Sequence, residues 1–165
     1  MTTPPFSDDH VITEADAQLL NSRGACVRGS LEVVGLTVQE AVKNNASDAL
    51  EYAANLLTPE AIDWCAKQDP CAALEFAADR LPPETLDWCA EQMPWAALQY
   101  SSNYLTPKRL DWCAKQKPWY ALRDAGSRLT PERLDWCARQ APCAALKFVA
   151  DRLTPERLKW CQQDA

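Results

Sequence analysis

The sequence repeats itself with a period of 24 residues. The clearest copies begin at Leu57, Leu81, Leu105, Leu129 and Leu153. Each copy reads approximately Leu-Thr-Pro-Glu-x-Leu-Asp-Trp-Cys-Ala-x-Gln-x-Pro-x-x-Ala-Leu. Internal periods of this length are typical of stacked repeat architectures, whose units cannot bury their apolar faces alone. The fold must therefore be built from small, similar units that pack against one another.

Each copy carries two signals for the start of a helix. The first is a threonine followed by proline, which places a hydroxyl N-cap before a residue suited to the first helical position. The second is an internal proline, which ends the preceding helix because the residue before a proline avoids helical geometry. The threonines are Thr58, Thr106, Thr130 and Thr154, and the internal prolines are Pro70, Pro94, Pro118 and Pro142. We therefore expect hairpins of two helices of about ten residues each, which are marginal in isolation.

Helical periodicity predicts which side chains of a hairpin are buried. In the first helix, Ile62, Cys65 and Ala66 lie on a broad apolar arc. In the second helix, Leu74 lies on the buried stripe and Ala72 faces outward. An arc this broad suits a helix that is covered by its partner and by both neighbouring copies. We therefore predict an all-α fold, a short α-solenoid of stacked helical hairpins that is capped at both ends.

The repeat also sets the expected organisation of the chain. Thr13 and Asp16 match a capping box at the start of a helix, and Gly24 and Gly35 are placed to end two helices before the repeats begin. The expected parts are a disordered tail (1–10), an N-terminal helical cap with a degenerate first repeat (11–56), four two-helix repeats spanning 57–152 (57–80, 81–104, 105–128 and 129–152), and a C-terminal half-repeat cap (153–165).

Composition narrows the cellular setting. No apolar run approaches the ~18 residues of a membrane-spanning helix, and the first residues lack the basic start and apolar stretch of a signal peptide. The net charge of −6 argues against a uniformly basic nucleic-acid binder. We therefore expect a cytoplasmic protein that makes no membrane contact.

Eight cysteines are many for a chain of 165 residues, but their spacing is that of the repeat. Neighbouring helix axes lie ~8–10 Å apart, beyond the ~7 Å Cα separation that a disulfide allows. There is no Cys-x-x-Cys pair and only one histidine, so we expect no metal and no cofactor. The repeated cysteines are predicted to be small buried hydrophobes; they are Cys65, Cys89, Cys113, Cys137 and Cys161. Reactivity stays open for the less constrained Cys26, Cys71 and Cys143.

Two other repeated residues have a structural and a functional interpretation. Tryptophans at Trp64, Trp88, Trp112, Trp136 and Trp160 are predicted to pack between copies, with a binding ladder as the alternative. The repeated aspartates Asp63, Asp87, Asp111 and Asp135 are predicted to be exposed, beside the bases Lys67, Lys115 and Arg139 at a spacing of four, so that solvated helix pairs form; catalytic carboxylates are the alternative. The folded part has no histidine base, no glycine-rich phosphate loop and no nucleophile motif, so we expect no enzyme.

Positions that differ between the copies are free to carry recognition. On the side of the second helix that we predict to face outward, the columns 47, 71, 95, 119, 143 and 48, 72, 96, 120, 144 change character in the middle copies, where they hold Trp95, Trp119 and Tyr120. Aromatic residues and arginine are enriched at interface hot spots. The candidate partner-binding residues are Trp95, Tyr100, Tyr104, Trp119, Tyr120 and Arg123. The alternative is that Trp95 and Trp119 only fill gaps between helices.

Charge is divided unevenly along the chain. Residues 1–104 hold 16 acids and 5 bases, net −11, and residues 105–165 hold 7 acids and 12 bases, net +5. Apart from Arg123, the basic patch of the third copy consists of Lys108, Arg109, Lys115, Lys117 and Arg128. A charge-polar stack is compatible with a monomer or with weak, charge-driven homo-oligomers that associate head to tail.

The block Leu129-Thr-Pro-Glu-Arg-Leu-Asp-Trp-Cys-Ala138, with the Pro-x-x-Ala-Leu that follows, resembles short tandem helical repeats of uncharacterised bacterial and bacteriophage proteins. This likeness of pattern covers residues 57–161 and implies no particular activity.

Three functions are therefore considered. The first is a non-catalytic protein–protein interaction module with a protein partner. The second is nucleic-acid binding through the basic third copy, which the overall negative charge opposes. The third is an acidic nucleic-acid mimic that inhibits a nucleic-acid-handling or defence protein.

Overall fold

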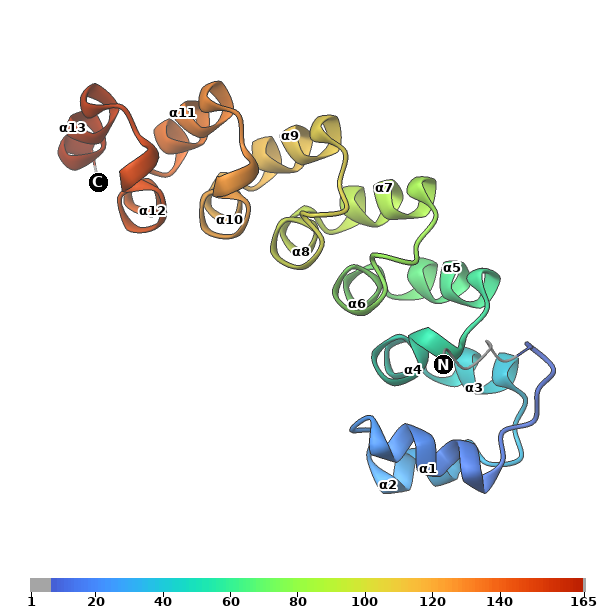
Figure 1. Cartoon of the computed structure of the whole chain (residues 1–165). Helices are drawn as coiled ribbons and strands as arrows, with labels where there is room; N and C mark the ends of the chain where they lie inside the picture. Colours follow the sequence, from blue (N-terminus) through green and yellow to red (C-terminus); the bar gives the residue numbers. More distant parts are fainter. Residues whose placement is uncertain (1–6, 165) are drawn as a thin grey trace. The chain divides into compact units, whose positions relative to one another are not determined.

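The computed structural model describes residues 7–164 and shows an all-α chain (Figure 1). Within these residues, thirteen α-helices and three short 3-10 helices follow one another, and no β-strand forms. A single isolated antiparallel bridge joins Val11 to Thr37. The predicted all-helical class is confirmed.

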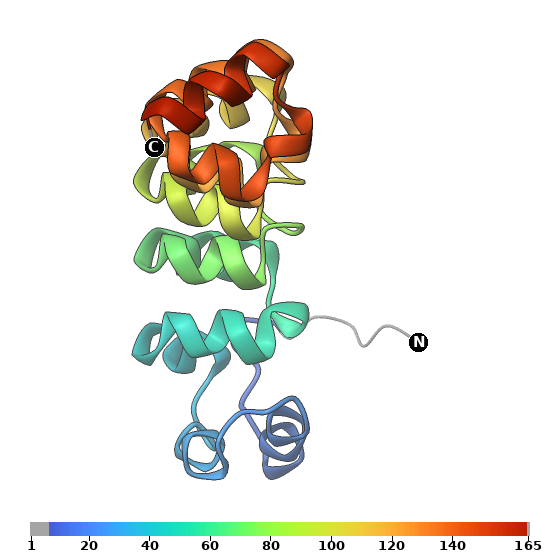
Figure 2. The ribbon, with the colours of Figure 1, turned by 90° about the vertical axis from the view of Figure 1, so that its left-hand side faces the viewer.

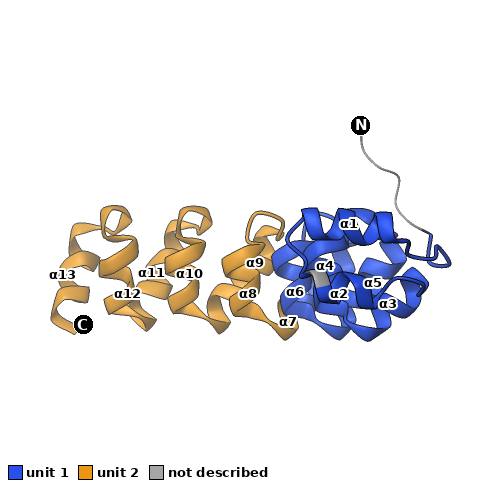
Figure 3. Ribbon diagram, turned by 90° about the horizontal axis from the view of Figure 1, so that it is seen from below, with its two compact units in different colours: residues 1–89 blue, residues 90–165 orange. Residues whose placement is uncertain are grey.

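The chain divides into two compact units, residues 1–89 and residues 90–165 (Figure 3). Helix α7 (Pro83–Gln92) contains the point of division. Unit 1 otherwise contains α1 (Glu14–Ser22), α2 (Val27–Glu32), α3 (Val38–Asn44), α4 (Ala46–Ala53), η1 (Ala54–Leu56), α5 (Pro59–Gln68) and α6 (Pro70–Phe76). Unit 2 contains α8 (Pro94–Tyr100), α9 (Pro107–Gln116), α10 (Pro118–Asp124), η2 (Gly126–Arg128), α11 (Pro131–Gln140), α12 (Pro142–Phe148), η3 (Ala150–Arg152) and α13 (Pro155–Asp164).

The helices of the repeats begin where the threonine and proline signals predict. The hydroxyl of Thr58 accepts a hydrogen bond from the backbone N–H of Ala61 at 3.2 Å, and the other three threonines make the same cap. The first helix of each copy has ten residues, as expected. The second has only seven, because the next residue, such as Ala77 with φ −137° and ψ 12°, has left helical geometry.

Packing within each unit joins first helices to first helices and second helices to second helices. In unit 1, α3 packs on α5 and α4 packs on α6. In unit 2, α8, α10 and α12 form one layer, and α9, α11 and α13 form the other (Figure 1). Leu98 and Leu122 are fully buried in the first of these layers. Small residues beside the leucines allow the helices to approach closely.

The five repeated cysteines are fully buried, as predicted, and the thiols of Cys89, Cys113, Cys137 and Cys161 each contact a backbone carbonyl of the preceding copy. The Sγ of Cys89 lies 3.8 Å from the carbonyl oxygen of Ala66, and that of Cys137 lies 3.8 Å from the carbonyl oxygen of Ala114. Burial raises the pKa of Cys65 to about 11 and that of Cys89 to about 12, so these thiols stay protonated. The thiols that contact carbonyls are weak hydrogen-bond donors, and all five repeated cysteines pack as small apolar groups.

One predicted orientation was wrong. Ala72, Ala96 and Ala144 are buried rather than outward-facing, although the helical wheel of a single hairpin places them on the open side. Within each unit, second helices of neighbouring copies pack on one another, α4 on α6 and α10 on both α8 and α12, so this position packs against a neighbouring copy. At the equivalent position Tyr120 is too large to be enclosed and is half-buried.

The repeated aspartates link copies as well as helical turns. The predicted ion pairs at a spacing of four are present, with Asp111 3.1 Å from Lys115 and Asp135 2.9 Å from Arg139. The same carboxylates also accept hydrogen bonds from Arg133 and Arg157, 22 residues further along the chain. In unit 1, Asp63 pairs in the same way with Lys67 and with the hydroxyl of Thr85. The prediction of purely local, solvated pairs was therefore incomplete.

We expect Asp135→Asn to lower the free energy of unfolding by about 0.5–1 kcal/mol at pH 7, a small value because Asp135 is 38% exposed and screened. The hydrogen bond from Arg157, opposed in part by burial, holds the pKa of Asp135 below its ordinary 3.8. A lowered pKa stabilises the fold above the ordinary value, and that contribution is lost as pH falls through the folded-state value. Urea unfolding should therefore show a smaller difference in the free energy of unfolding between wild type and variant at pH 3 than at pH 7. Asp151→Asn, at an exposed site, is the matched control, and an equal loss in both variants would contradict the link.

The start of the described chain differs from the expected disordered tail. Residues 1–6 of that tail lie outside the described residues. The backbone oxygens of Asp8 and His10 accept hydrogen bonds from the N–H groups of Gln39 and Val38, at 3.0 and 2.9 Å. The side chain of Asp8 also accepts a hydrogen bond from Thr58 at 3.0 Å. Ile12 and Val38, which lie beside these hydrogen bonds, are buried, so the segment from residue 8 to residue 10 is held against the fold.

Three predicted helix boundaries near the N-terminus are confirmed. Thr13 and Asp16 form a capping box at the start of α1. Gly24 and Gly35 adopt φ values of 101° and 88°, which side chains disfavour, and they follow α1 and α2. Two extended segments join the α1–α2 hairpin to the α3–α4 hairpin (Figure 2), and Ile12 and Leu36 pair across them at 2.9 Å.

Candidate interaction site

Five of the six predicted partner-binding residues lie on two adjacent helices of unit 2. Trp95 and Tyr100 belong to α8, and Trp119, Tyr120 and Arg123 belong to α10. Trp95 lies 6.3 Å from Tyr100 and 6.0 Å from Tyr120 between ring centres, and Trp119 lies 5.2 Å from Tyr120. Edge-on and tilted rings at these separations attract each other beyond simple burial. The side chains therefore form one connected cluster that crosses from α8 to α10.

Arg123 is held over this cluster. Its guanidinium lies 4.7 Å from the ring centre of Trp119 and 5.0 Å from that of Tyr120, within the range of cation–π attraction. It also donates hydrogen bonds to the carboxylate of Asp124 at 2.7 Å and to the side-chain oxygen of Gln99 at 2.9 Å. The bond to Asp124 raises the pKa of Arg123 despite partial burial. These contacts together hold the arginine in one orientation.

The cluster extends onto α12 through residues that sequence reasoning did not select. Phe148 lies 5.6 Å from Trp119 between ring centres, and the ammonium of Lys147 lies 5.1 Å from the ring of Phe148. The signal was present, because Phe148 occupies the same repeat position as Tyr100. We call this surface the aromatic face, and it consists of Trp95, Tyr100, Trp119, Tyr120, Arg123 and Phe148.

Tyr104 lies in the turn after α8 and is 52% exposed. No ring contact joins it to the aromatic face within residues 7–164, so it is a separate exposed side chain.

The residues of the aromatic face differ in how far their side chains are exposed, which distinguishes those that pack between helices from those that a partner could reach. Trp95 and Tyr120 are half-buried, which is consistent with a role in filling space between α8 and α10. Trp119 is 41% exposed and Tyr100 is 36% exposed, although both are large apolar rings. The gap-filling alternative therefore fits Trp95 and does not account for Trp119. An accessible indole on a rigid aromatic base is the feature expected of an interface anchor.

The predicted basic patch does not form one cationic surface. Arg109 pairs with Glu91 at 2.8 Å and its guanidinium lies 5.4 Å from the ring centre of Trp112, and Lys115 pairs with Asp111 at 3.1 Å. The remaining members, Lys108, Lys117 and Arg128, are exposed and lie on α9, in the turn after it and in η2. Part of the positive charge is thus neutralised within the protein.

The three less constrained cysteines lie in different surroundings. Burial, with Asp69 and Glu75 nearby, raises the pKa of Cys71, which disfavours the reactive thiolate. Cys143 is exposed on α12. The sulfur of Cys26 accepts a hydrogen bond from the N–H of Gly29 at 3.2 Å and caps α2. Among the described residues, no group of three or more metal-ligating side chains is placed to hold an ion.

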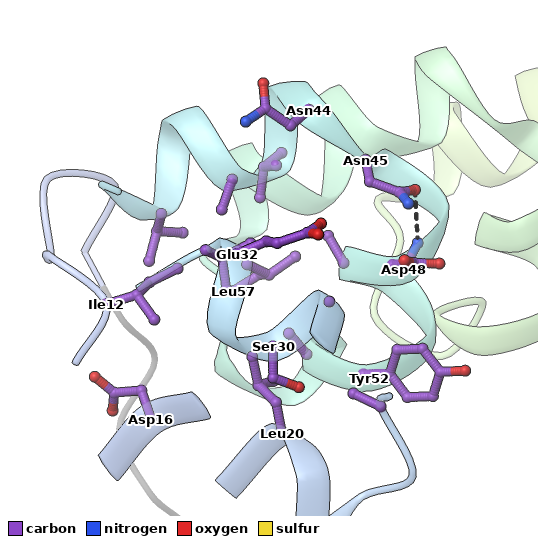
Figure 4. Close-up of a pocket in the computed structure, with 18 of the residues that line it drawn as sticks. Ile12, Asp16, Leu20, Ser30, Glu32, Asn44, Asn45, Asp48, Tyr52 and Leu57 are labelled. Atoms are coloured by element: carbon purple, nitrogen blue, oxygen red, sulfur yellow. Dashed lines mark hydrogen bonds between the residues drawn. The ribbon is translucent and has the colours of Figure 1, made fainter. Parts of the chain in front are cut away.

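Sequence reasoning missed a pocket in unit 1. A cavity of about 560 Å³ lies between the α1–α2 hairpin and the α3–α4 hairpin (Figure 4). Its walls come from helices that lack the repeated tryptophan and proline, so no repeat position marks them. Only the tertiary arrangement of two degenerate hairpins creates this space.

Comparison with known proteins identifies no relative. The chain matches no protein-family profile, no curated protein and no solved structure. Over residues 7–164, none of the helices combines the length and the apolar character that crossing a membrane requires.

Proposed function

We propose that this protein is a non-catalytic interaction module that binds a partner protein through the aromatic face. The observation that carries the proposal is the exposure of Trp119. Its ring contacts the rings of Tyr120 and Phe148, and the guanidinium of Arg123 lies over it. Tryptophan, tyrosine and arginine dominate interface hot spots. Because Arg123 and the rings are already fixed by one another, ordering them on binding costs little.

The proposal includes the architecture that presents this face. The helices form an α-solenoid of 24-residue hairpins, with α1–α2 and α13 as the caps. Its support is the recurrence of the same contacts in unit 2, where α8, α10 and α12 pack in series and each buried thiol meets the preceding copy. Such stacks present long surfaces without a preformed catalytic cleft.

The charges around the face favour a protein partner over a nucleic acid. Nucleic-acid binding needs cations that are free to neutralise phosphates. Arg123 is committed to Asp124, while Arg109 and Lys115 have acidic partners within unit 2. The side chains left accessible at the centre of the face are aromatic, which suits the apolar core of a protein interface.

We expect Trp119→Ala to weaken partner binding at least about tenfold, the loss typical of a hot-spot residue. The matched control is Trp88→Ala, because Trp88 is 37% exposed, close to the 41% of Trp119, and lies outside the aromatic face. Both variants and the wild type would be immobilised and exposed to extract of the native host, and retained proteins quantified by mass spectrometry. Circular dichroism would establish that all three are folded.

The expected result is one or more proteins retained by the wild type and by Trp88→Ala but lost with Trp119→Ala. Equal retention by all three chains would contradict the assignment of the aromatic face. Retention of no protein above the bare matrix would contradict the interaction function itself.

A further inference from the structure

The pocket of unit 1 has an apolar interior. Side chains that line it include Ile12, Leu20, Val33, Val38 and Val42, contributed by α1, by α3 and by the segments beside them. Its volume of about 560 Å³ lies within the usual range for sites that hold small molecules. A space of this size between two hairpins is large enough for a ligand with an apolar body.

The polar groups of the pocket are all neutral or acidic. Asp16, Glu32 and Asp48 line it, together with the hydroxyl-bearing Ser30 and Tyr52, and no lysine or arginine among the described residues does. Figure 4 shows Glu32 reaching across the opening from α2, with Asp48 and Tyr52 at one end and Asp16 at the other. The pocket is therefore negative as well as apolar.

The three carboxylates are not equally available to a ligand. Asp16 caps α1 and contacts His10 at 3.1 Å, so its charge is used within the fold. Glu32 pairs with Arg28 at 2.9 Å, but both side chains are exposed, at 63% and 91%, and such a pair is weak. The backbone N–H of Asp48 is bonded to Asn45, and its carboxylate is exposed at the start of α4. A cation is therefore best placed at the end formed by Glu32, Asp48 and Tyr52.

The surroundings add to this negative potential. Residues 1–56 carry eight acids and three bases, net −5, and every residue that lines the pocket except Leu57 belongs to that segment. The two hairpins that form it are tied by paired extended segments on one side, where Val11 bridges Thr37. Among the described residues, neither α1 nor α2 packs closely against α3 or α4, and Figure 2 shows the ribbons of the two hairpins apart except at these extended segments. A ligand can enter there without breaking a packed core.

We propose that this pocket binds a small organic cation, an amine attached to an apolar aliphatic or aromatic body. The apolar body occupies the space among Leu20, Val33 and Val42, and the ammonium group lies between Glu32 and Asp48. Charge-assisted hydrogen bonds to the carboxylates supply the preference for a cation over a neutral molecule of the same shape. The site is independent of the aromatic face, which lies wholly in unit 2.

The direct test is fluorescence titration of the full chain with dansylcadaverine, a primary amine on an apolar fluorophore. The matched neutral probe is its N-acetyl derivative, which keeps the body and removes the charge. We expect the amine to bind with a dissociation constant on the order of 10 μM, the level that ligands of this size reach at ordinary efficiency. The neutral probe is expected to bind about tenfold more weakly. Equal affinity for both probes, or no binding of the amine at millimolar concentration, would overturn the proposal.

Two variants locate the binding on this pocket. Ala49→Trp places an indole in the cavity and should abolish binding of both probes. The double variant Glu32→Gln with Asp48→Asn should keep weak binding and lose the discrimination between amine and neutral probe. Its matched control is Glu75→Gln with Asp79→Asn, which removes two exposed carboxylates of unit 1 that do not line the pocket.

The double variant keeps the test decisive where Ala49→Trp fails to fold, because it changes no apolar packing. Unchanged discrimination in the double variant would overturn the role of Glu32 and Asp48. If the control variant Glu75→Gln with Asp79→Asn lost the same discrimination between the two probes, only the overall charge would matter, and this result would overturn the site as well.

Discussion

Leu122→Ala is expected to lower the free energy of unfolding by about 3 kcal/mol, whereas Leu146→Ala is expected to lower it by about 1 kcal/mol. The two leucines occupy the same repeat position, on α10 and on α12. Leu122 is 1% exposed, while Leu146 is only half-buried, and within residues 7–164 α12 packs on one second helix, α10, rather than between two. Deleting a fully buried leucine side chain removes its transfer free energy and leaves a cavity. At the partly open site, the loss of transfer free energy is smaller and water fills the space.

Urea unfolding followed by tryptophan fluorescence measures both values under the same conditions. The pair is informative because the residue type and its position in the helix are the same. An equal cost at both positions would mean that stacking of successive copies does not provide the burial. It would then count against the repeat architecture proposed above.

Gly126→Ala is expected to destabilise the protein by about 2 kcal/mol, although alanine ordinarily has a higher helix propensity than glycine. A Cβ atom at this position would lie 2.7 Å from Cγ1 of Val149, a β-branched side chain that cannot turn away easily. Overpacking of this kind costs ~1–3 kcal/mol. One copy earlier, the equivalent residues are Ser102 and Ala125. The pair Gly126 and Val149 has the same number of side-chain heavy atoms as the pair Ser102 and Ala125, but the larger side chain is at the second position in one pair and at the first position in the other.

A double-mutant cycle tests this compensation. Val149→Ala alone should destabilise the protein, because Val149 is 3% exposed and its truncation leaves a void. The combination of Gly126→Ala with Val149→Ala should be at least about 1 kcal/mol more stable than the sum of the two losses predicts. Strict additivity of the two changes in the free energy of unfolding would show that these positions do not share one space.

Local chemistry explains why the helix boundaries were predictable. A threonine hydroxyl three residues before an N–H, or a proline after a non-helical residue, acts within one turn of chain. Thr58 and Pro70 therefore mark the same boundaries in the sequence and in the structure. The burial of the cysteines was predictable for a similar reason, since Cys65 lies on the arc that any neighbour would cover.

Contacts between copies were less predictable. Asp135 was expected to pair only with Arg139, because a single helix shows only neighbours four residues away. Its second partner, Arg157, depends on the offset between stacked helices, which no single copy reveals. Ala72 was placed outward for the same reason, since the wheel of one hairpin omits the helices on either side.

The candidate sites divide along the same line. Sequence variation among the copies was enough to select Trp119, Tyr120 and Arg123, because exposed repeat positions that change character stand out against a constant frame. The contacts of Phe148 and the isolation of Tyr104 required the arrangement of α8, α10 and α12. The pocket had no signal at all, since it is a space between degenerate hairpins.

Sequence alone thus determined the helical hairpins, their boundaries and the residues available for recognition, because capping, proline geometry and periodicity act over a few residues. Tertiary structure alone decided which carboxylates link copies, which aromatic rings meet and where a cavity remains. Those features depend on the offset and spacing of helices from different copies. Packing between whole hairpins sets these quantities, and no single 24-residue unit contains them.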